Sequence, residues 1–549
     1  MAAPKNRAVV IGLDGATWDL LDRFFGEGVL PNLERLRREG AWGKLRSVVP
    51  PMTATAWTSS MTGKGPGKHG IYDWTEPVGS SYLYRPIDST KVQSRTLFEQ
   101  LSDSGQRVCT VNLPLTWPAR PINGIAVGDM LTPSKDTPGF THPPSFKAEL
   151  DRWVPDYQID THLCEEESDL LPFLGRLRSM LEGRGVVVRR LMEQESWDLL
   201  WVVWVEMDRM QHCVWHIFDR DHPHHDPALA ARYRAPILDI YRLLDTRVGE
   251  MVERRPEGSN LYFLSDHGFG PCRYKVFLNT WLAQEGFLRF KEGGHQGRQR
   301  VQRLRGMLDR AGLDTRRIIG TAKKLGLGNL LARNSDSLSR FAADIDWENT
   351  QAFCHGTNAI RINLRGRERQ GSVDPSDYDR VVRRLKERLL EMQDPEGNSV
   401  IQKVQTRSEL YSGPFVEGAA DLLISDHDDS VWFYYSEGEV PEEVFERSGW
   451  SSGNHKPDGI FLAWGPDIRP GVVEGAHIND FTPTLLAGLG QPIPDDVDGR
   501  PLVEIFDRRS KIRPTFQEAT VYESKVDTGH NAATDAAITE RLRGLGYLQ

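Results

Sequence analysis

Short runs of apolar residues alternate along the chain with longer stretches whose apolar residues recur at helical spacing. Most of the short runs are apolar on both faces, which is typical of strands buried in a parallel sheet between layers of helices. The predicted strands are 8–13, 107–111, 199–205, 261–264, 421–425 and 460–464, and the predicted helices are 31–39, 170–195, 227–255, 378–392 and 483–489. The pattern therefore predicts an α/β fold with helices on both faces of the sheet.

One stretch, 286–340, departs from this pattern through its charge. It contains 13 Lys and Arg residues against four Asp and Glu residues, and apolar residues at 301, 304, 307, 308 and 311 follow helical spacing. This combination predicts basic amphipathic helices, which form either a solvated cap over the core or a surface for an anionic substrate or membrane headgroups. We therefore predict a core formed by 1–270 and 401–549, with a cap insertion at 271–400.

The composition of the 549 residues is that of an ordinary soluble globular protein, with 39% hydrophobic residues, 26% charged residues and a net charge of −9. This charge gives no reason to expect a nucleic-acid partner. The first apolar run ends at Asp14 and is too short for a signal peptide, and no apolar stretch is long enough to cross a bilayer. Five cysteines without paired spacing give no disulfide framework. These observations predict a cytoplasmic protein.

The stretch 50–70 carries the first candidate for chemistry. Pro50 and Pro51 end the segment before it, and the small and hydroxylated residues after Met52 can begin a helix. Thr53 is then expected at a helix N-terminus, where free N–H groups and the positive end of the helix dipole favour a phosphate. A hydroxyl in this position is either a helix cap or a nucleophile, and partners elsewhere in the chain decide between the two.

Acidic and imidazole side chains gather at the ends of the predicted strands. Asp208 and His212 have a spacing that places both on one face of a helical turn, and His455 precedes the last predicted strand. Taken singly, each carboxylate is explained as well by a helix cap, and each histidine by a core or surface position. Together they supply nitrogen and oxygen ligands for two divalent cations, as zinc accepts, and such a pair can polarise a phosphoryl oxygen. The full set is Asp14, Thr53, Asp208, His212, Asp266, His267 and His455.

These motifs make the chain resemble a known family. It resembles the alkaline phosphatase superfamily, in particular the type I phosphodiesterase/nucleotide pyrophosphatase branch and its bacterial phosphohydrolase or phosphomutase relatives. The resemblance implies an alkaline-phosphatase-like α/β core with a mostly parallel central sheet, and a helical or α+β cap insertion. The segments that carry it are 12–15, 53–71, 208–212, 265–268, 455 and 480–486 and, for the bacterial subgroup, 346–350, 363–367 and 542–547.

The resemblance also implies an activity and its cofactors, two divalent metal ions that are zinc, with manganese as the alternative. The implied ligand sets are Asp208, His212 and His455 for one ion, and Asp14, Asp266, His267 and the Thr53 oxygen for the other. Thr53 would attack phosphorus and form a phospho-threonine, which a metal-activated water hydrolyses. We therefore predict a phosphoric ester hydrolase, more specifically a phosphodiesterase, whose substrate is a small phosphate ester or a lipid headgroup.

The sequence departs from that family in its phosphate-binding groups. Nucleotide pyrophosphatases carry an asparagine shortly after a His-Gly-Ile segment, whereas here His69-Gly70-Ile71 leads to Trp74. This difference weighs against a nucleotide substrate. Asn112 is either a replacement hydrogen-bond donor or a turn residue. The chain also shows no clear extra acidic set for a third metal ion, which weighs against a specialised phosphomonoesterase.

Other functions stay open on the same core. A phosphomutase or phosphotransferase would return the phosphoryl group to an acceptor held by the cap, and a non-catalytic binding protein would hold no metal. A sulfatase is disfavoured because residues 53–57 do not offer the Cys or Ser that is converted to formylglycine. The histidine-rich run 222–225 is predicted to be a polar loop. The sequence does not predict the oligomeric state.

Overall fold

The computed structural model describes residues 6–291, 342–434, 441–510, 512–520, 522 and 532–548. The basic helices predicted within 286–340 fall almost entirely outside these described residues. No helix in the described part of the chain combines the length and the apolar character needed to cross a membrane.

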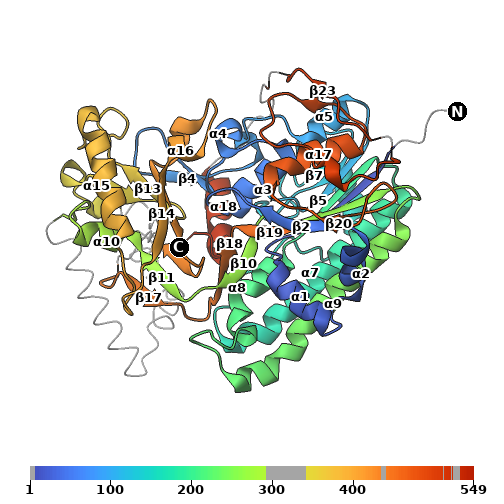
Figure 1. Cartoon of the computed structure of the whole chain (residues 1–549), viewed down its shortest axis with the longest axis horizontal. Helices are drawn as coiled ribbons and strands as arrows, with labels where there is room; N and C mark the ends of the chain where they lie inside the picture. Colours follow the sequence, from blue (N-terminus) through green and yellow to red (C-terminus); the bar gives the residue numbers. More distant parts are fainter. Residues whose placement is uncertain are drawn as a thin grey trace.

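A large twisted sheet forms the centre of the molecule, with helices on both faces (Figure 1). In the described residues it has ten strands, and five neighbouring strands at its centre, β9, β1, β8, β5 and β6, run parallel. In spatial order the strands are β20 (Gly471–Val472), β2 (Ala41–Arg46), β19 (Asp458–Trp464), β9 (Asn260–Leu264), β1 (Ala8–Leu13), β8 (Leu199–Trp204), β5 (Val108–Val111), β6 (Gly124–Val127) and β7 (Thr141–His142), with β21 (Ala476–His477) beside β2. The predicted mostly parallel sheet is therefore confirmed.

The sheet is mixed because β19 runs antiparallel to both of its neighbours, β9 and β2. This direction matters for the site, since the residues that precede β19 arrive at the edge where the parallel strand β9 ends. Strands β1, β8 and β9 have every residue buried, which is what helices on both faces require.

Two layers of helices cover the sheet (Figure 1). One layer contains α1 (Trp18–Gly26), α2 (Pro31–Glu39), α7 (Glu167–Gln194), α8 (Glu206–Phe218) and α9 (Pro227–Arg254). The other contains α3 (Thr53–Thr62), α5 (Leu97–Asp103) and α17 (Phe481–Gly488). The helices predicted at 31–39, 170–195, 227–255 and 483–489 correspond to α2, α7, α9 and α17, with ends that differ by zero to three residues.

Smaller sheets lie beside the central one. A four-stranded sheet of the described residues has the order β12 (Ala352–Cys354), β13 (Ala359–Ile362), β15 (Leu422–Asp426) and β14 (Ile401–Thr406), and α15 (Tyr378–Leu390) packs beside β14. A three-stranded sheet joins β16 (Val431–Tyr434), β11 (Tyr274–Phe277) and β17 (Phe445–Arg447), and β10 (Gly268–Pro271) pairs with β18 (Gly453–Lys456).

The interpretation of 421–425 as a strand of the central sheet is wrong. That segment is β15, which lies between β13 and β14 and pairs antiparallel with both. A strand in the middle of any sheet can be apolar on both faces, so the local pattern does not tell which sheet it joins. The predicted limits 1–270, 271–400 and 401–549 stay a prediction, and sheet membership favours a later return to the core than residue 401.

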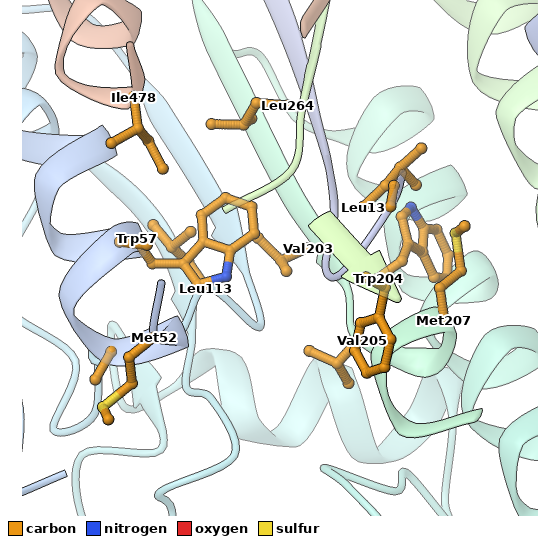
Figure 2. Close-up of a cluster of buried hydrophobic side chains, with 14 of the residues drawn as sticks. Leu13, Met52, Trp57, Leu113, Val203, Trp204, Val205, Met207, Leu264 and Ile478 are labelled. Atoms are coloured by element: carbon orange, nitrogen blue, oxygen red, sulfur yellow. The ribbon is translucent and has the colours of Figure 1, made fainter. Parts of the chain in front are cut away.

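An apolar layer lies beneath the ends of the parallel strands (Figure 2). It brings Met52, directly before α3, and Trp57 of α3 together with Leu113 and Val203. Gly12 in β1 permits this contact, because a Cβ atom at that position would lie 2.5 Å from the Trp57 ring. The absence of a side chain at Gly12 therefore lets α3 approach the sheet closely enough to deliver its first residue, Thr53.

Candidate active site

Three buried carboxylates meet at the edge where the parallel strands end. Asp14 follows β1, Asp266 follows β9, and Asp208 lies in the first turn of α8, directly after β8. Because β1 lies between β8 and β9, these three residues are neighbours in space. All three side chains are fully buried. The prediction that the acidic residues gather at the strand ends therefore agrees with the structure.

A glycine after the first carboxylate allows this crowding. Gly15 has a φ of 69°, in the left-handed region, and a Cβ atom there would lie 3.2 Å from the Cα of Asp208. Its backbone N–H donates to Asp266 Oδ1 at 3.3 Å. On the other side, the Trp57 indole donates to Asp14 Oδ2 at 3.0 Å. One oxygen of Asp14 and one of Asp266 are thus fixed by the protein.

The three predicted histidines are all oriented in the same way. The Nδ1 atoms of His212, His267 and His455 lie 3.2, 3.0 and 3.0 Å from the backbone carbonyl oxygens of Gly453, Gly268 and Pro51, respectively. A carbonyl oxygen only accepts hydrogen bonds, so each Nδ1 carries the proton and each Nε2 presents a lone pair. This is the arrangement that orients a histidine as a metal ligand.

The Nε2 atoms and the remaining carboxylate oxygens converge on one another. His212 Nε2 and His455 Nε2 are 3.1 Å apart, and Asp208 Oδ1 lies 3.5 and 3.3 Å from them. Asp266 Oδ2 lies 3.2 Å from His267 Nε2, and Asp14 Oδ1 lies 3.7 Å from it. Asp14 Oδ1, Asp208 Oδ1 and Asp266 Oδ2 are buried without any hydrogen-bond partner. Buried oxygens left unpaired beside imidazole Nε2 lone pairs are the donor set that divalent cations require.

The ligand atoms form two overlapping groups. Asp208, His212 and His455 make the first, which is the set implied for one metal ion. The second consists of Asp14, Asp208 and His267. The second group contains Asp14 and His267, which are also in the ligand set implied for the other metal ion. Asp208 belongs to both observed groups, and Asp266 lies beside His267. Asp208 thus lies between the two candidate cation positions.

Burial and mutual repulsion shift the pKa values of these groups. Burial, followed by the charges of Asp266 and Asp208, raises the pKa of Asp14 well above its usual value. Burial and the charge of Asp208 raise the pKa of Asp266 to about 8. Burial also opposes ionisation of Asp208, but its pKa falls well below the usual value because His212 and His455, in their protonated forms, and Arg209 stabilise the carboxylate. Burial lowers the pKa values of both His212 and His267. Bound cations would offset this repulsion and favour the carboxylates and neutral imidazoles.

Thr53 is the first residue of α3 and not its cap. Met52 occupies the N-cap position, and no side chain caps this helix. The Thr53 Oγ1 atom instead lies 3.3 Å from His267 Nε2 and 3.2 Å from the Tyr547 hydroxyl. The fully buried hydroxyl therefore faces the carboxylate and histidine cluster from the N-terminus of a helix.

Two polar residues at this centre were not predicted from the sequence. The fully buried Arg209 donates to Asp208 Oδ2, to Asp160 Oδ2 at 2.9 Å and to the Tyr547 hydroxyl at 2.9 Å. Burial raises the pKa of Tyr547 well above its usual value. Tyr547 belongs to a segment noted for its resemblance to the bacterial subgroup, but nothing in the spacing links residue 547 to residue 53. The sequence feature that points to Arg209 is its position directly after the predicted ligand Asp208.

The weaker candidates have other roles. Asn112 adopts a left-handed backbone with a φ of 58° and donates to the Val203 carbonyl at 3.2 Å, which agrees with the turn interpretation. Trp74 is buried, and its ring lies 4.9 Å from that of Tyr547. In the histidine-rich run, His222 Nε2 lies 3.0 Å from the Cys272 carbonyl oxygen. None of the metal-ligating groups found among the described residues includes that run.

An open pocket adjoins the cluster. His212, His455 and Tyr547 are among the residues that line it. Its wall is aromatic and neutral, and among the described residues that line it there is no Lys, Arg, Asp or Glu. The wall residues with aromatic or neutral polar side chains include Trp432, Phe433, Tyr434, Thr357, Asn358 and Asn454.

Comparisons with known proteins agree with this arrangement. The sequence profile of the type I phosphodiesterase / nucleotide pyrophosphatase family matches residues 8–458. Phosphonoacetate hydrolase from Sinorhizobium meliloti 1021, solved with phosphonoformate, superposes with a TM-score of 0.52 at 14% identity, over 89% of this chain and 96% of that one. Human ectonucleotide pyrophosphatase / phosphodiesterase 5 superposes with a TM-score of 0.50 at 13% identity, over 91% and 100%. A search of curated protein sequences gave no match. At these identities the two structures bear on the fold alone.

Proposed function

Because the chain belongs to the type I phosphodiesterase/nucleotide pyrophosphatase family, we propose that it hydrolyses a phosphodiester with Thr53 as the nucleophile. Membership in this family confirms the predicted resemblance and the predicted enzyme class, a phosphoric ester hydrolase. The proposal rests on one observation above all. A threonine hydroxyl at a helix N-terminus faces three histidine Nε2 atoms and three unpaired carboxylate oxygens across a buried cluster.

The chain's own residues account for most of the proposed reaction. The Thr53 hydroxyl gives up its proton and its oxygen attacks phosphorus, so that a bond from Oγ1 to phosphorus forms. The ester bond breaks with its electron pair on the leaving oxygen, which takes up one proton in return and departs as an alcohol. Water then attacks the phospho-threonine, which releases the phosphate monoester and regenerates the Thr53 hydroxyl. The first N–H groups of α3 have no partner within the helix and favour the negative charge of the phosphoryl group.

Two divalent cations fit the donor set described above. When bound, they would supply positive charge to the phosphoryl oxygens and lower the pKa of the attacking hydroxyl. We propose His212, His455 and Asp208 as ligands for one, and Asp14, Asp266, His267 and Thr53 as ligands for the other, with Asp208 near both. Three imidazoles with carboxylates favour zinc, and manganese remains the alternative.

The pocket wall favours a diester over a monoester. A phosphate monoester is a dianion at neutral pH and gains from cationic side chains around it, whereas a diester carries one charge and a second, neutral substituent. The described wall offers aromatic rings and uncharged amides and hydroxyls, and no Lys or Arg. Such a wall suits an uncharged ester substituent better than a second phosphate charge.

Replacing Thr53 tests the proposal. We expect Thr53→Ala to lower the turnover of bis(p-nitrophenyl) phosphate by about a thousandfold or more, since removal of a covalent nucleophile costs factors of that order. Zinc and manganese, measured in the purified protein by elemental analysis, are expected at about two ions per chain in the parent protein. Thr58→Ala is the matched control, because Thr58 lies on the same helix and its hydroxyl donates only to the Ala54 carbonyl. Unchanged turnover by Thr53→Ala would refute the nucleophile.

A further inference from the structure

The hydroxyl of Tyr547 lies at the centre of the candidate site, although 494 residues separate it from Thr53. It is 3.2 Å from Thr53 Oγ1 and 2.9 Å from the nearest guanidinium nitrogen of Arg209. It therefore touches the atom that the proposed reaction uses for attack. The pocket beside the cluster is also lined by Tyr547 and by the two residues before it.

The fold holds this tyrosine in place from several sides. It follows α18 (Ala532–Gly544), which lies near the middle of the molecule between the central and the smaller sheets (Figure 1). The carbonyl of Gly544 accepts from the Leu163 N–H at 2.9 Å, and Gly546 turns the chain with a φ of 80°. Leu545 and Leu548, on either side, are buried. The segment is thus anchored before and after Tyr547.

The tyrosine ring is fixed as well. It packs on Trp74, the residue that stands where nucleotide pyrophosphatases carry a phosphate-binding asparagine, with ring centroids 4.9 Å apart. On another side, the Arg209 guanidinium lies 5.3 Å from the ring centroid. Asp160 and Asp208 bind the same guanidinium, so its position does not depend on Tyr547. Trp74 and Arg209 together direct the hydroxyl towards Thr53.

Donor and acceptor roles at this hydroxyl follow from its partners. Arg209 only donates, so the Tyr547 oxygen accepts that hydrogen bond and its own hydrogen is available for the Thr53 side. Once Thr53 loses its proton in order to attack, its oxygen can only accept. Tyr547 must then donate, either to that oxygen or to a phosphoryl oxygen bonded to it. A donor held in advance at such a position stabilises the developing negative charge.

We infer that Tyr547 is a catalytic residue, which donates its hydrogen bond to a non-bridging oxygen of the phosphoryl group and replaces the asparagine that Trp74 displaces. This inference rests on the proposed function only in taking Thr53 as the nucleophile. Arg209 acts through Tyr547 as a positioning residue, because its hydrogen bond sets the direction of the phenol O–H.

A solely structural role does not explain this environment. The buried tyrosines Tyr241 and Tyr262 have hydroxyls without any hydrogen-bond partner, so the fold tolerates a tyrosine hydroxyl that makes no bond. Tyr547 instead has its hydroxyl between a guanidinium and the Thr53 hydroxyl. Replacement by phenylalanine would keep the ring contacts and remove only the hydroxyl.

The test compares Tyr547→Phe with the parent enzyme and with Tyr241→Phe. Tyr241 is a control because its hydroxyl is buried and lies outside the site on α9. For Tyr547→Phe we expect kcat for bis(p-nitrophenyl) phosphate to fall about a hundredfold, the usual effect of losing one oxyanion donor, with KM changed less than about threefold. Orthovanadate imitates the trigonal-bipyramidal phosphorus, and its affinity, measured by calorimetry, should weaken by a similar factor. Tyr241→Phe should change neither value.

The outcomes separate this inference from the proposed function. If the parent enzyme cleaves the diester and Tyr547→Phe keeps kcat and vanadate affinity within about threefold, the inference is overturned while the function stands. A higher kcat in Tyr547→Phe would overturn it too, because the hydroxyl would then obstruct Thr53. If the parent enzyme cleaves no diester but loses vanadate affinity with Tyr547→Phe, the proposed function fails and the role of Tyr547 stands.

Discussion

The two sides of the candidate site are built from different parts of the molecule. The carboxylate and histidine cluster lies at the edge of the central sheet, is buried, and contains three carboxylate oxygens that the protein alone leaves without a hydrogen-bond partner. The pocket wall comes largely from segments around β13 and β16, from the stretch before α3 and from the stretch after α18, and its described residues include no Lys, Arg, Asp or Glu. The cluster thus carries the reactive groups, and the wall gives the pocket its shape and its apolar surface.

This difference indicates that catalysis and substrate affinity are determined by separate parts of the enzyme. Strands with every residue buried fix the cluster, so its geometry is not easily changed. The wall is contributed largely by loops and short strands outside the central sheet, where substitutions disturb the core less. We therefore expect changes in the cluster to affect catalysis and metal content, and changes in the wall to affect substrate affinity.

The largest effect is expected at Asp208, which takes part in both cation groups. Asp208→Asn removes a charge whose oxygen lies within 4.0 Å of all three histidine Nε2 atoms. A loss of several kcal/mol of metal-dependent stabilisation corresponds to a fall in kcat/KM of about a thousandfold. Elemental analysis should also show fewer than two ions per chain. Asp245→Asn, a buried aspartate that accepts from the Leu33 N–H, is the control and should lower thermal stability with little loss of activity. Activity of Asp208→Asn within tenfold of the parent would contradict the assignment of catalysis and metal binding to the cluster.

A smaller effect is expected in the pH dependence of the folding stability of the metal-free protein. Asp266 is protonated in the folded state up to about pH 8 but ionised in the unfolded chain, so the folded state binds more protons and its stability falls as the pH rises through that range. Below 6.5, protonation of the unfolded His212 and His267 works in the opposite direction, because their folded pKa values are lowered. Between pH 6.5 and 8 the carboxylate effect therefore acts without opposition from these histidines.

Asp266 alone is expected to lower the free energy of unfolding of the metal-free protein by about 2 kcal/mol over that interval. Zinc should remove this dependence, since the ion favours the ionised carboxylates. Denaturant unfolding at several pH values, after chelation and after addition of zinc, measures both. Asp266→Asn should flatten the curve of the metal-free protein. A metal-free protein that gains stability between pH 6.5 and 8 would show that the cluster does not hold these protons.

The smallest effect is expected in the pocket wall. Trp432 is half-buried, and its ring centroid lies 6.1 Å from that of His212. Trp432→Ala should raise KM for bis(p-nitrophenyl) phosphate by about tenfold, which corresponds to the loss of roughly 1.4 kcal/mol of aromatic contact, and should change kcat by less than threefold. Trp153→Ala, in a half-buried tryptophan outside the wall, is the control. A fall in kcat at unchanged KM would mean that the wall takes part in the chemical step.

The strand patterns predicted five of the ten strands that the described residues contribute to the central sheet, β1, β5, β8, β9 and β19, and the residue types suggested the candidate ligands. Strands such as β1 and β8 were predictable because burial on both faces leaves a continuous apolar run. The sheet that β15 joins was not, because pairing partners are set by distant segments. His455 was predicted as a ligand, yet the reason that it reaches the cluster, the antiparallel direction of β19, is a property of the sheet and not of the local sequence.

Arg209 and Tyr547 mark the limit of prediction at the site. Their roles depend on hydrogen bonds between residues far apart in the chain, and no sequence spacing predicts these hydrogen bonds. The metal identity, the cytoplasmic location and the anionic contact through 286–340 stay predictions.

Because β19 runs antiparallel to β9, the geometry of the site depends on the register in which β19 pairs. A slip of two residues in the pairing of β19 would keep its apolar faces in the core, so burial alone would scarcely penalise it. The same slip would draw β18, which directly precedes β19 and carries His455, about 7 Å out of its pairing with β10 and away from Asp208 and His212. A bound cation would therefore distinguish the correct register from a neighbouring one that the hydrophobic core accepts, and assembly of the site would act as a check on assembly of the sheet.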